Sequence, residues 1–431
     1  MNPEEERVIR AWEADDRDFF DRFVKEYQEW PESGKEPQGA GQDVRHYLDL
    51  QQKRIAQHGL QLKLQLDPFE VPPISAYKVF PALYRDRIQR SLVYRSYHLQ
   101  KEWKRKGKTL LREKGEITLY QTLISADVRD ERLAATEIVC PSCGAAVKIR
   151  ELEEGCPYCG THYVMQDLFP KVIDLYTLPT PGNEERTMNP QIRRWCFSGA
   201  GILVLFALCT AFLNRAAYTE ALAYVGLVFS LLFAAAAGAF LGYLAYSFSL
   251  LIGLFGQLSE SLPLAFGGRG SRRKIRRELM SYDPSFTYEY LQGKAMSLLR
   301  IILFEKDPLD SALYQGAPPD PSFAQLVDIA YRGALNVEKV EKEAESLAVT
   351  LRLYLLNTYD RGERLEEKKE VLHMRMVYAG KPEEEPLFRV QRVRCPSCGS
   401  SYDAAYAKRC PSCGSCNEFE RKGWIVTEIR R

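Results

Sequence analysis

Residues 195–213 read WCFSGAGILVLFALCTAFL and contain no charged side chain. A second uncharged run begins near Ala221 and continues to about Phe255. About 20 apolar residues in a helix cross the hydrocarbon core of a membrane, so the first run fits one crossing. Uncharged runs of this length are rare in soluble domains, which disfavours a hairpin buried in a soluble core. We therefore predict a two-helix transmembrane hairpin over residues 195–256.

The second apolar run is longer than one crossing needs. Two crossings within it would require a turn without polar residues, which a bilayer disfavours. We expect one helix from about Ala221 to Ala245, with an extension that is tilted or lies at the membrane surface. A second crossing in this run stays open as the alternative.

The charges that flank the hairpin indicate its orientation. Arg193 and Arg194 precede it, and the short loop offers only Arg215 against Glu220. A basic segment follows it and contains Arg269, Arg272, Arg273, Lys274, Arg276 and Arg277. The positive-inside rule then predicts a multi-pass protein of the cell membrane with both termini in the cytoplasm. The acidic N-terminus, which does not resemble a secretory signal peptide, agrees with this orientation.

The basic segment after the hairpin also predicts a lipid-binding site. Each of its six cationic side chains contributes about 1 kcal/mol when it lies near an anionic membrane surface. We expect these residues to contact anionic lipid headgroups. The alternative is that they only determine the topology, and both interpretations can hold.

Eight of the eleven cysteines form two sets of paired C-P-x-C-G motifs. The first set is Cys140, Cys143, Cys156 and Cys159, and the second is Cys395, Cys398, Cys410 and Cys413. Two intervening residues let a tight turn present both thiolates to one ion, and the following glycine can adopt the positive φ that completes the turn. Four sulfurs in a tetrahedron suit zinc. We predict two structural Zn²⁺ sites in zinc ribbons at residues 135–175 and 394–431.

Other interpretations of the cysteines are weaker. Four thiolates could hold iron as in rubredoxin, and a single CxxC could be a redox pair. Disulfides are typical of small secreted chains, and this sequence shows no export signal. Cys416 could compete as a ligand, and His162 follows Cys159 closely, but four cysteines already complete each site.

The sequence after the basic segment predicts an α+β domain over residues 278–393. Thr287 is a suitable N-cap, and Phe286 and Leu291 have the spacing of a hydrophobic staple. Alternating apolar residues at 349–355 indicate a half-buried strand, and residues 371–378 and 387–393 provide two more. Helices followed by an antiparallel meander are typical of helices packed on a curved sheet.

These features resemble the bacterial TIM forty-four-like membrane proteins, a family named after a peripheral subunit of the mitochondrial presequence translocase. The resemblance covers roughly residues 135–431. It is carried by the D-P-x-F-[ST]-x-E motif that begins at Asp283, by the CPSCG pairs, and by Gly423-Trp424-Ile425-Val426. It implies a cone like that of nuclear transport factor two, and association with lipid or protein rather than catalysis.

The resemblance does not extend to the N-terminal region, residues 1–134, which we expect to be helical. The pattern predicts an amphipathic helix over residues 8–27, a linker at 31–42, and helices at 44–56 and 84–103. The basic stretch 101–114 fits a solvated helix face, a lipid contact or a nucleic-acid contact. Short strands at 119–124 and 371–377 precede the two ribbons.

No motif in the sequence indicates an enzyme. The five histidines form no HxxxH or HExxH pair, and no Walker A, GxGxxG or G-x-S-x-G motif is present. We expect a non-catalytic, membrane-anchored scaffold or adaptor that binds anionic lipid and an unidentified protein, with self-association left open. The alternatives are a component of membrane transport or protein translocation, and a membrane-tethered zinc-ribbon protein that binds nucleic acid, which we disfavour.

Overall fold

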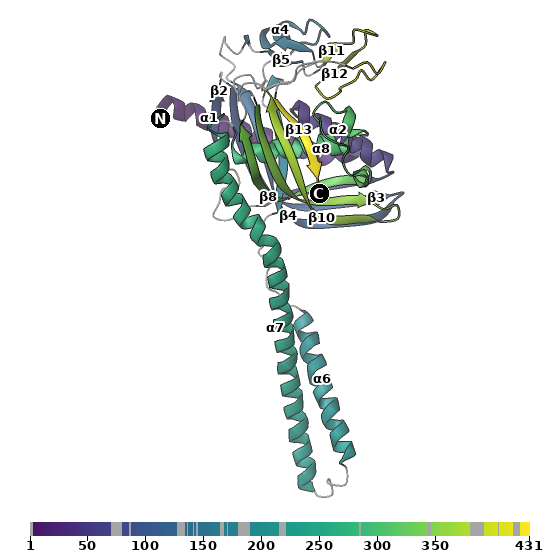
Figure 1. Ribbon diagram of the computed structural model, residues 1–431. Helices are drawn as coiled ribbons and strands as arrows, with labels where there is room; N and C mark the ends of the chain where they lie inside the picture. Colours follow the sequence, from purple (N-terminus) through teal and green to yellow (C-terminus); the bar gives the residue numbers. More distant parts are fainter. Residues whose placement is uncertain are drawn as a thin grey trace. The chain divides into compact units, whose positions relative to one another are not determined.

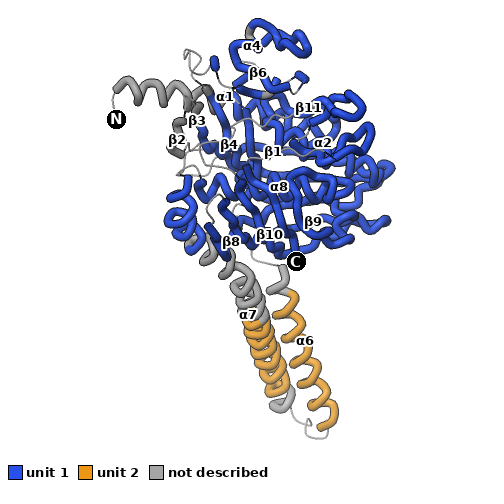
Figure 2. Tube along the Cα trace, turned by 45° about the horizontal axis from the view of Figure 1, so that its top comes forward, with its two compact units in different colours: residues 1–181, 266–431 blue, residues 182–265 orange. Residues whose placement is uncertain are grey.

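The computed structural model describes the chain except for residues 1–2, 70–79, 86–87, 127–133, 136, 141, 144, 164–167, 170, 180–189, 215–220, 284–285, 343–345, 380–391, 404 and 417–422. Within helices and strands, side chains are also not described at 3–17, 80–85, 88–89, 126, 139, 153, 190–193, 221–224, 249–269 and 392–393. The chain divides into two compact units (Figure 2). One unit comprises residues 1–181 and 266–431, and the other comprises residues 182–265.

The smaller unit is a pair of apolar helices, α6 (Pro190–Leu213) and the first part of α7 (Ala221–Lys274). The segments Arg194–Leu213 and Val225–Phe248 are long and apolar enough to span a membrane. Because α7 is one continuous helix, the second apolar run does not turn back on itself. The alternative of a second crossing within it is therefore wrong.

Glycines let α6 and α7 pack closely against each other. A Cβ atom added to Gly199 would clash with the carbonyl oxygen of Gly238, and one added to Gly242 would clash with that of Trp195. Small residues at such crossings allow two helix backbones to approach within van der Waals contact in a membrane. The hairpin is therefore a packed pair of helices.

The larger unit contains two halves, and the N-terminal half begins with α1 (Pro3–Ser33) and α2 (Gln42–Gln57). Its antiparallel sheet has the order β1-β3-β4-β7, and β2 pairs with β3. The strands are β1 (Gln61–Pro68), β2 (Phe80–Arg85), β3 (Ile88–Arg105), β4 (Lys108–Ala126) and β7 (Lys171–Pro179). Between β4 and β7 lie β5 (Glu137–Val139), β6 (Ala146–Lys148), α4 (Ile149–Glu154) and the first cysteine set.

The C-terminal half begins with the π-helical turn η2 (Ile275–Leu279) and α8 (Tyr288–Phe304). Two short 3₁₀ turns, η3 (Pro308–Asp310) and η4 (Pro321–Gln325), lead to an antiparallel sheet of order β13-β10-β9-β8. Its strands are β8 (Leu326–Lys342), β9 (Ser346–Asp360), β10 (Leu365–Ala379) and β13 (Gly423–Arg430). The second cysteine set, with β11 (Arg392–Arg394) and β12 (Ser401–Asp403), lies in the chain segment that connects β10 to β13; β11 and β12 are labelled in Figure 1.

The two halves repeat one topology. Each has a helix, an antiparallel meander, a ribbon, and a last strand that returns to pair with the final strand of the meander. Sixteen positions separate Ile124, near the end of β4, from Cys140, and sixteen separate Ala379, the end of β10, from Cys395. The pairings of β4 with β7 and of β10 with β13 both contain a register shift. The chain therefore contains an internal structural repeat.

One apolar core joins the two halves. It includes Phe20 and Phe23 of α1, Leu123 of β4, and Leu298 and Leu299 of α8. Most side chains of α8 are buried, so this helix lies at the centre of the core. Residues 1–181 and 266–431 therefore form a single unit, in which the N-terminal region, both ribbons and the C-terminal α+β region are combined.

The expected helix over residues 84–103 is wrong, because the described residues of this stretch belong to β2 and β3, which pair with each other. Strand β3 continues through a tight turn at Lys106 and Gly107, whose φ angles of 49° and 78° suit a two-residue hairpin, into β4. The N-terminal region is therefore not purely helical. By contrast, α2 confirms the helix expected at 44–56. Residues 387–391 of another expected strand lie outside the described residues.

The start of α8 confirms one local prediction. The backbone N–H of Tyr290 donates a 3.1 Å hydrogen bond to the hydroxyl oxygen of Thr287, which makes Thr287 the N-cap. Phe286 and Leu291, the expected staple pair, are both fully buried. Because residues 284–285 lie outside the described part of the chain, the structure tests only part of the motif that begins at Asp283.

Candidate metal centres

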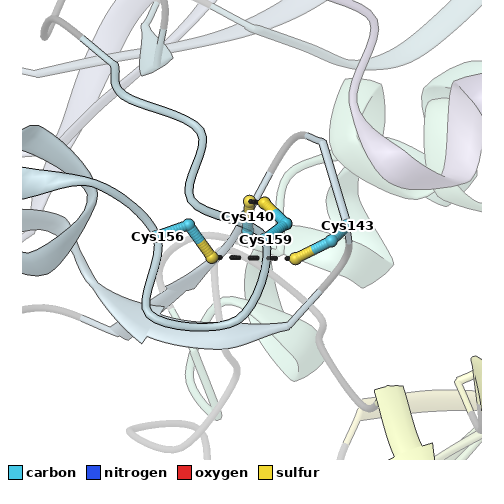
Figure 3. Close-up of side chains that lie close together, drawn as sticks. All are labelled: Cys140, Cys143, Cys156 and Cys159. Atoms are coloured by element: carbon cyan, nitrogen blue, oxygen red, sulfur yellow. Dashed lines mark hydrogen bonds between the residues drawn. The ribbon is translucent and has the colours of Figure 1, made fainter.

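The first cysteine set forms a compact four-sulfur cluster in the insertion between β4 and β7. Its four Sγ atoms lie within 4.8 Å of one another (Figure 3). The Sγ atoms of Cys140 and Cys159 are 3.7 Å apart, and so are those of Cys143 and Cys156. These separations are far longer than the roughly 2.05 Å of a disulfide bond. The cluster therefore offers four thiols, none of them in a disulfide, that could hold one metal ion.

The second set forms an equivalent cluster between β10 and β13, again with all four Sγ atoms within 4.8 Å of one another. The Sγ atoms of Cys395 and Cys413 are 3.6 Å apart, and those of Cys398 and Cys410 are 3.7 Å apart. In a tetrahedron with metal–sulfur bonds of about 2.3 Å, the sulfurs lie about 3.8 Å apart. Both clusters fit such an ion, as the sequence predicts.

The backbone of each motif forms the tight turn that the spacing predicts. The N–H of Gly399 donates to the carbonyl of Cys395, and that of Gly414 to the carbonyl of Cys410, both at 2.8 Å. Gly160, Gly399 and Gly414 have φ angles of 69°, 74° and 73°, a conformation in which L-residues with a Cβ atom are strained. The fourth glycine of the set, Gly144, lies outside the described residues.

Nearby hydroxyl groups favour the thiolate form at two ligands. A hydrogen bond to the hydroxyl of Thr161 lowers the pKa of Cys159 to about 6. A hydrogen bond to the hydroxyl of Ser415 lowers the pKa of Cys395 to about 6 in the same way. Burial instead raises the pKa of Cys143 to about 12. Each cluster as a whole would lose its protons when an ion binds, because the thiolate is the metal ligand.

Other cysteines and His162 do not belong to the clusters. Cys416 is exposed and its backbone forms a β-bridge with Arg409. The ring of His162 packs over Gly155, where a Cβ atom would meet it at 2.8 Å. Cys196 and Cys209 lie on α6 as free thiols. The structure therefore groups the eight cysteines that the sequence selects.

The six basic residues after the hairpin have different environments. Arg272 pairs with Glu289 at 2.5 Å and lies over the ring of Tyr288. Lys274 donates to the carbonyl of Glu338. The exposed members are Arg272, Arg273, Arg276 and Arg277, while the side chain of Arg269 is not described. Arg272 and Lys274 therefore help to attach the end of α7 to the C-terminal half.

Part of the basic stretch 101–114 is engaged in ion pairs rather than free as a cationic surface. The stretch forms the hairpin of β3 and β4, in which Trp103 is fully buried. Lys101 pairs with Asp328, and Arg105 pairs with Asp360 at 2.6 Å. The expectation of a solvated helix face is wrong, and these ion pairs also weaken the case for a lipid or nucleic-acid contact here.

Sequence reasoning missed a group of buried polar residues between the halves. The Nζ atom of Lys294 in α8 lies 2.8 Å from Asp43 in α2, and the hydroxyl of Tyr406 donates to the same carboxylate at 2.7 Å. Burial raises the pKa of the nearby Asp174 to about 6. Burial lowers the pKa of His46 to about 4. These residues are far apart in the sequence, so no local pattern reveals the group.

Comparisons with known proteins do not identify the chain: no family model, no curated protein and no solved structure matches it.

Proposed function

We propose that the protein is a non-catalytic scaffold anchored in the cell membrane by α6 and α7, with its larger unit on the cytoplasmic side. The observation that carries this proposal is the exposure of apolar side chains along both candidate spans. Phe197, Phe206, Phe229 and Phe233 are each between 66% and 76% exposed. In the first span no residue of the apolar window is buried, and in the second span 11% of the window is buried. Exposure of these apolar surfaces to water is unfavourable, and lipid would cover them.

Zinc is the ion that we propose for both cysteine clusters. The sulfur separations agree with zinc–thiolate bonds, and four cysteines per ion match the closed coordination of structural zinc. A closed site leaves no position for a substrate or a reactive water molecule. The ions would therefore stabilise the ribbons rather than catalyse a reaction. Iron, which also accepts four thiolates, is the outcome that metal analysis must exclude.

The TIM forty-four-like assignment remains part of the proposal for the C-terminal half. The N-capped helix α8, the four-stranded sheet, the ribbon and the buried Trp424 of β13 support it. The sheet face toward the core is filled by alternate side chains of β9, which are Leu347, Val349, Leu351, Leu353 and Leu355. We therefore assign lipid or protein binding to outer surfaces of this cone rather than to its interior.

Anionic lipid is the proposed ligand of the exposed arginines Arg273, Arg276 and Arg277. The uncharged run ends near Phe255, and Arg272 lies 17 positions further along the same continuous helix. At about 1.5 Å per residue, this stretch is about 26 Å long. Contact with headgroups therefore requires α7 to bend between these two residues, because a charge about 26 Å from the membrane surface would be screened.

Native mass spectrometry in mild detergent tests the lipid contact. We expect the wild-type chain to retain anionic phosphatidylglycerol over zwitterionic phosphatidylcholine. The triple variant Arg273→Glu, Arg276→Glu, Arg277→Glu should lose this preference. A charge-matched control, Lys25→Glu, Lys35→Glu, Lys63→Glu, changes three exposed lysines of the N-terminal half outside the basic stretch 101–114 and should keep it. Equal lipid retention by the wild type and the arginine variant would contradict lipid binding at this segment.

A further inference from the structure

The two ribbons have the same position in the repeat but different connections to the rest of the chain. The first ribbon forms a small core of its own, in which Ile138, Val147 and Leu152 pack with Ile124 of β4 and Cys140. In the second ribbon, Ala405 and Tyr406 belong to the main core that joins the two halves. The second ribbon therefore reaches beyond its own half of the repeat.

Tyr406 connects the second ribbon to α2 of the N-terminal half. Its hydroxyl donates to the Oδ1 atom of Asp43 at 2.7 Å, and its ring stacks on His46 with centroids 3.9 Å apart. The other oxygen of Asp43 accepts from Lys294 at 2.8 Å. Asp43 and Lys294 are each 8% exposed, so the carboxylate depends on these partners in place of water.

The same loop is also bonded to the C-terminal half. The N–H of Ala312 donates to the carbonyl of Tyr406, and the N–H of Lys408 donates to the carbonyl of Asp310 at 3.0 Å. A further contact joins Gln42 of the N-terminal half to Asp403 at 3.3 Å. The described residues of the loop from Asp403 to Lys408 therefore bridge both halves.

The metal site closes the two ends of this bridging loop. Cys398 lies before the loop and Cys410 lies after it, and their Sγ atoms are 3.7 Å apart. An ion between them would hold the loop closed. Without the ion, the loop would have more conformational freedom. Docking of Tyr406 on α2 would then cost more conformational entropy. Occupancy of the cluster and the position of Tyr406 are therefore linked.

We propose that metal bound at the second four-cysteine site holds the N-terminal half against the C-terminal half through Tyr406, and that the first site has no such role. This inference rests on the metal binding in the proposed function. It makes the pairing of the halves depend on metal supply, because loss of one ion would loosen the contact of α2 with α8. The duplicated ribbon supplies a matched control within the same chain.

Hydrogen exchange of the full chain in detergent, with metal analysis of each sample, tests the proposal. The variant Cys410→Ser/Cys413→Ser removes one pair of ligands from the second site, and Cys156→Ser/Cys159→Ser removes the equivalent pair from the first. Each should lose one zinc ion. We expect exchange at residues 42–48 of α2 to rise at least about tenfold in the second-site variant and to stay within about twofold of wild type in the first-site variant. Peptides of β9 and β10 should stay protected in both.

A tyrosine variant with both sites intact covers the case in which the second-site variant unfolds globally. Tyr406→Ala should retain two zinc ions and reproduce the faster exchange of α2, and Tyr406→Phe should show a smaller increase. The inference is overturned if Tyr406→Ala leaves α2 protected, or if both ribbon variants expose α2 equally. A wild-type chain without metal would overturn the proposed zinc sites as well. If the wild type carries two zinc ions, and the second-site variant loses one of them but keeps the wild-type exchange rate in α2, only this inference is overturned.

Discussion

Single buried side chains hold the two halves of the larger unit together. Arg54 of α2 is 6% exposed and donates hydrogen bonds of 2.9 to 3.0 Å to four carbonyl groups of the C-terminal half. The acceptors are Leu303, Glu305, Phe323 and Ala324. The planar guanidinium offers donors in several directions, which a lysine could not match. This residue therefore fixes the C-terminal end of α2, whereas Tyr406 contacts Asp43 and His46 at its N-terminal end.

Replacement of Arg54 should be strongly destabilising. Arg54→Met keeps an apolar stem but removes the donors for all four carbonyl groups, and hydrogen bonds to charged groups contribute about 1.5–3 kcal/mol each. We expect the free energy of unfolding to fall by roughly 3 kcal/mol or more in urea titrations. The neighbouring control Lys53→Met, at a position 64% exposed, should change it by less than about 0.5 kcal/mol. Equal effects would contradict the assigned role of Arg54.

The buried Asp174 predicts a pH dependence of stability whose sign follows from its raised pKa. Burial raises its pKa from 3.8 to about 6. The folded state therefore binds the proton more tightly than the unfolded state, and the resulting stabilisation is present below about pH 4 and is lost as the pH rises through about 6. The loss amounts to roughly 3 kcal/mol at most.

The variant Asp174→Asn should remove this loss, because the amide stays neutral and can still accept the hydrogen bond from Ser297. We expect its free energy of unfolding, relative to wild type, to increase between about pH 4 and about pH 7. Denaturant titrations at both pH values measure the difference. Asp67→Asn, at an exposed position, serves as the control and should give no such change. A constant difference for Asp174→Asn would show that its carboxylate is not perturbed by burial.

At the scale of elements, glycines determine how closely α6 and α7 pack. Gly242→Leu should force the helices apart, because a Cβ there meets the backbone of Trp195. Overpacking of this kind costs about 1–3 kcal/mol. We expect a lower midpoint for loss of helical circular dichroism when detergent-solubilised protein is titrated with sodium dodecyl sulfate. Gly226→Leu on the same helix meets no atom within 4 Å and should keep the wild-type midpoint.

Elements whose sequence pattern is local could be predicted, and elements that depend on distant residues could not. Helix α2 and the N-cap of α8 follow from periodicity and one capping residue, and both are confirmed. The β3–β4 hairpin was missed because its turn is Lys106-Gly107 rather than Asn-Gly or Asp-Gly, and because its lysines and arginines imitate a solvated helix. Two of those cations instead pair with Asp328 and Asp360 of the other half.

At the scale of the whole molecule, the cysteine spacing and the apolar runs were sufficient to predict two four-cysteine clusters that could hold a metal ion and a pair of long apolar helices. The internal repeat was only partly predictable: a strand before each CPSCG motif is visible in the sequence, but the two copies share too little else to indicate a duplicated domain. The joint core was also hidden. It depends on pairs such as Asp43 with Lys294, which are 251 positions apart. Long-range pairs of this kind leave no periodic signal in a single sequence.

The metal content of the chain tests the central claim most directly. We would purify the full chain in mild detergent and determine zinc and iron per chain by elemental analysis and native mass spectrometry. The proposed structural sites predict two zinc ions per chain, and one after removal of Cys410 and Cys413. A wild-type chain that carries no metal, or that carries iron in place of zinc, would contradict the account.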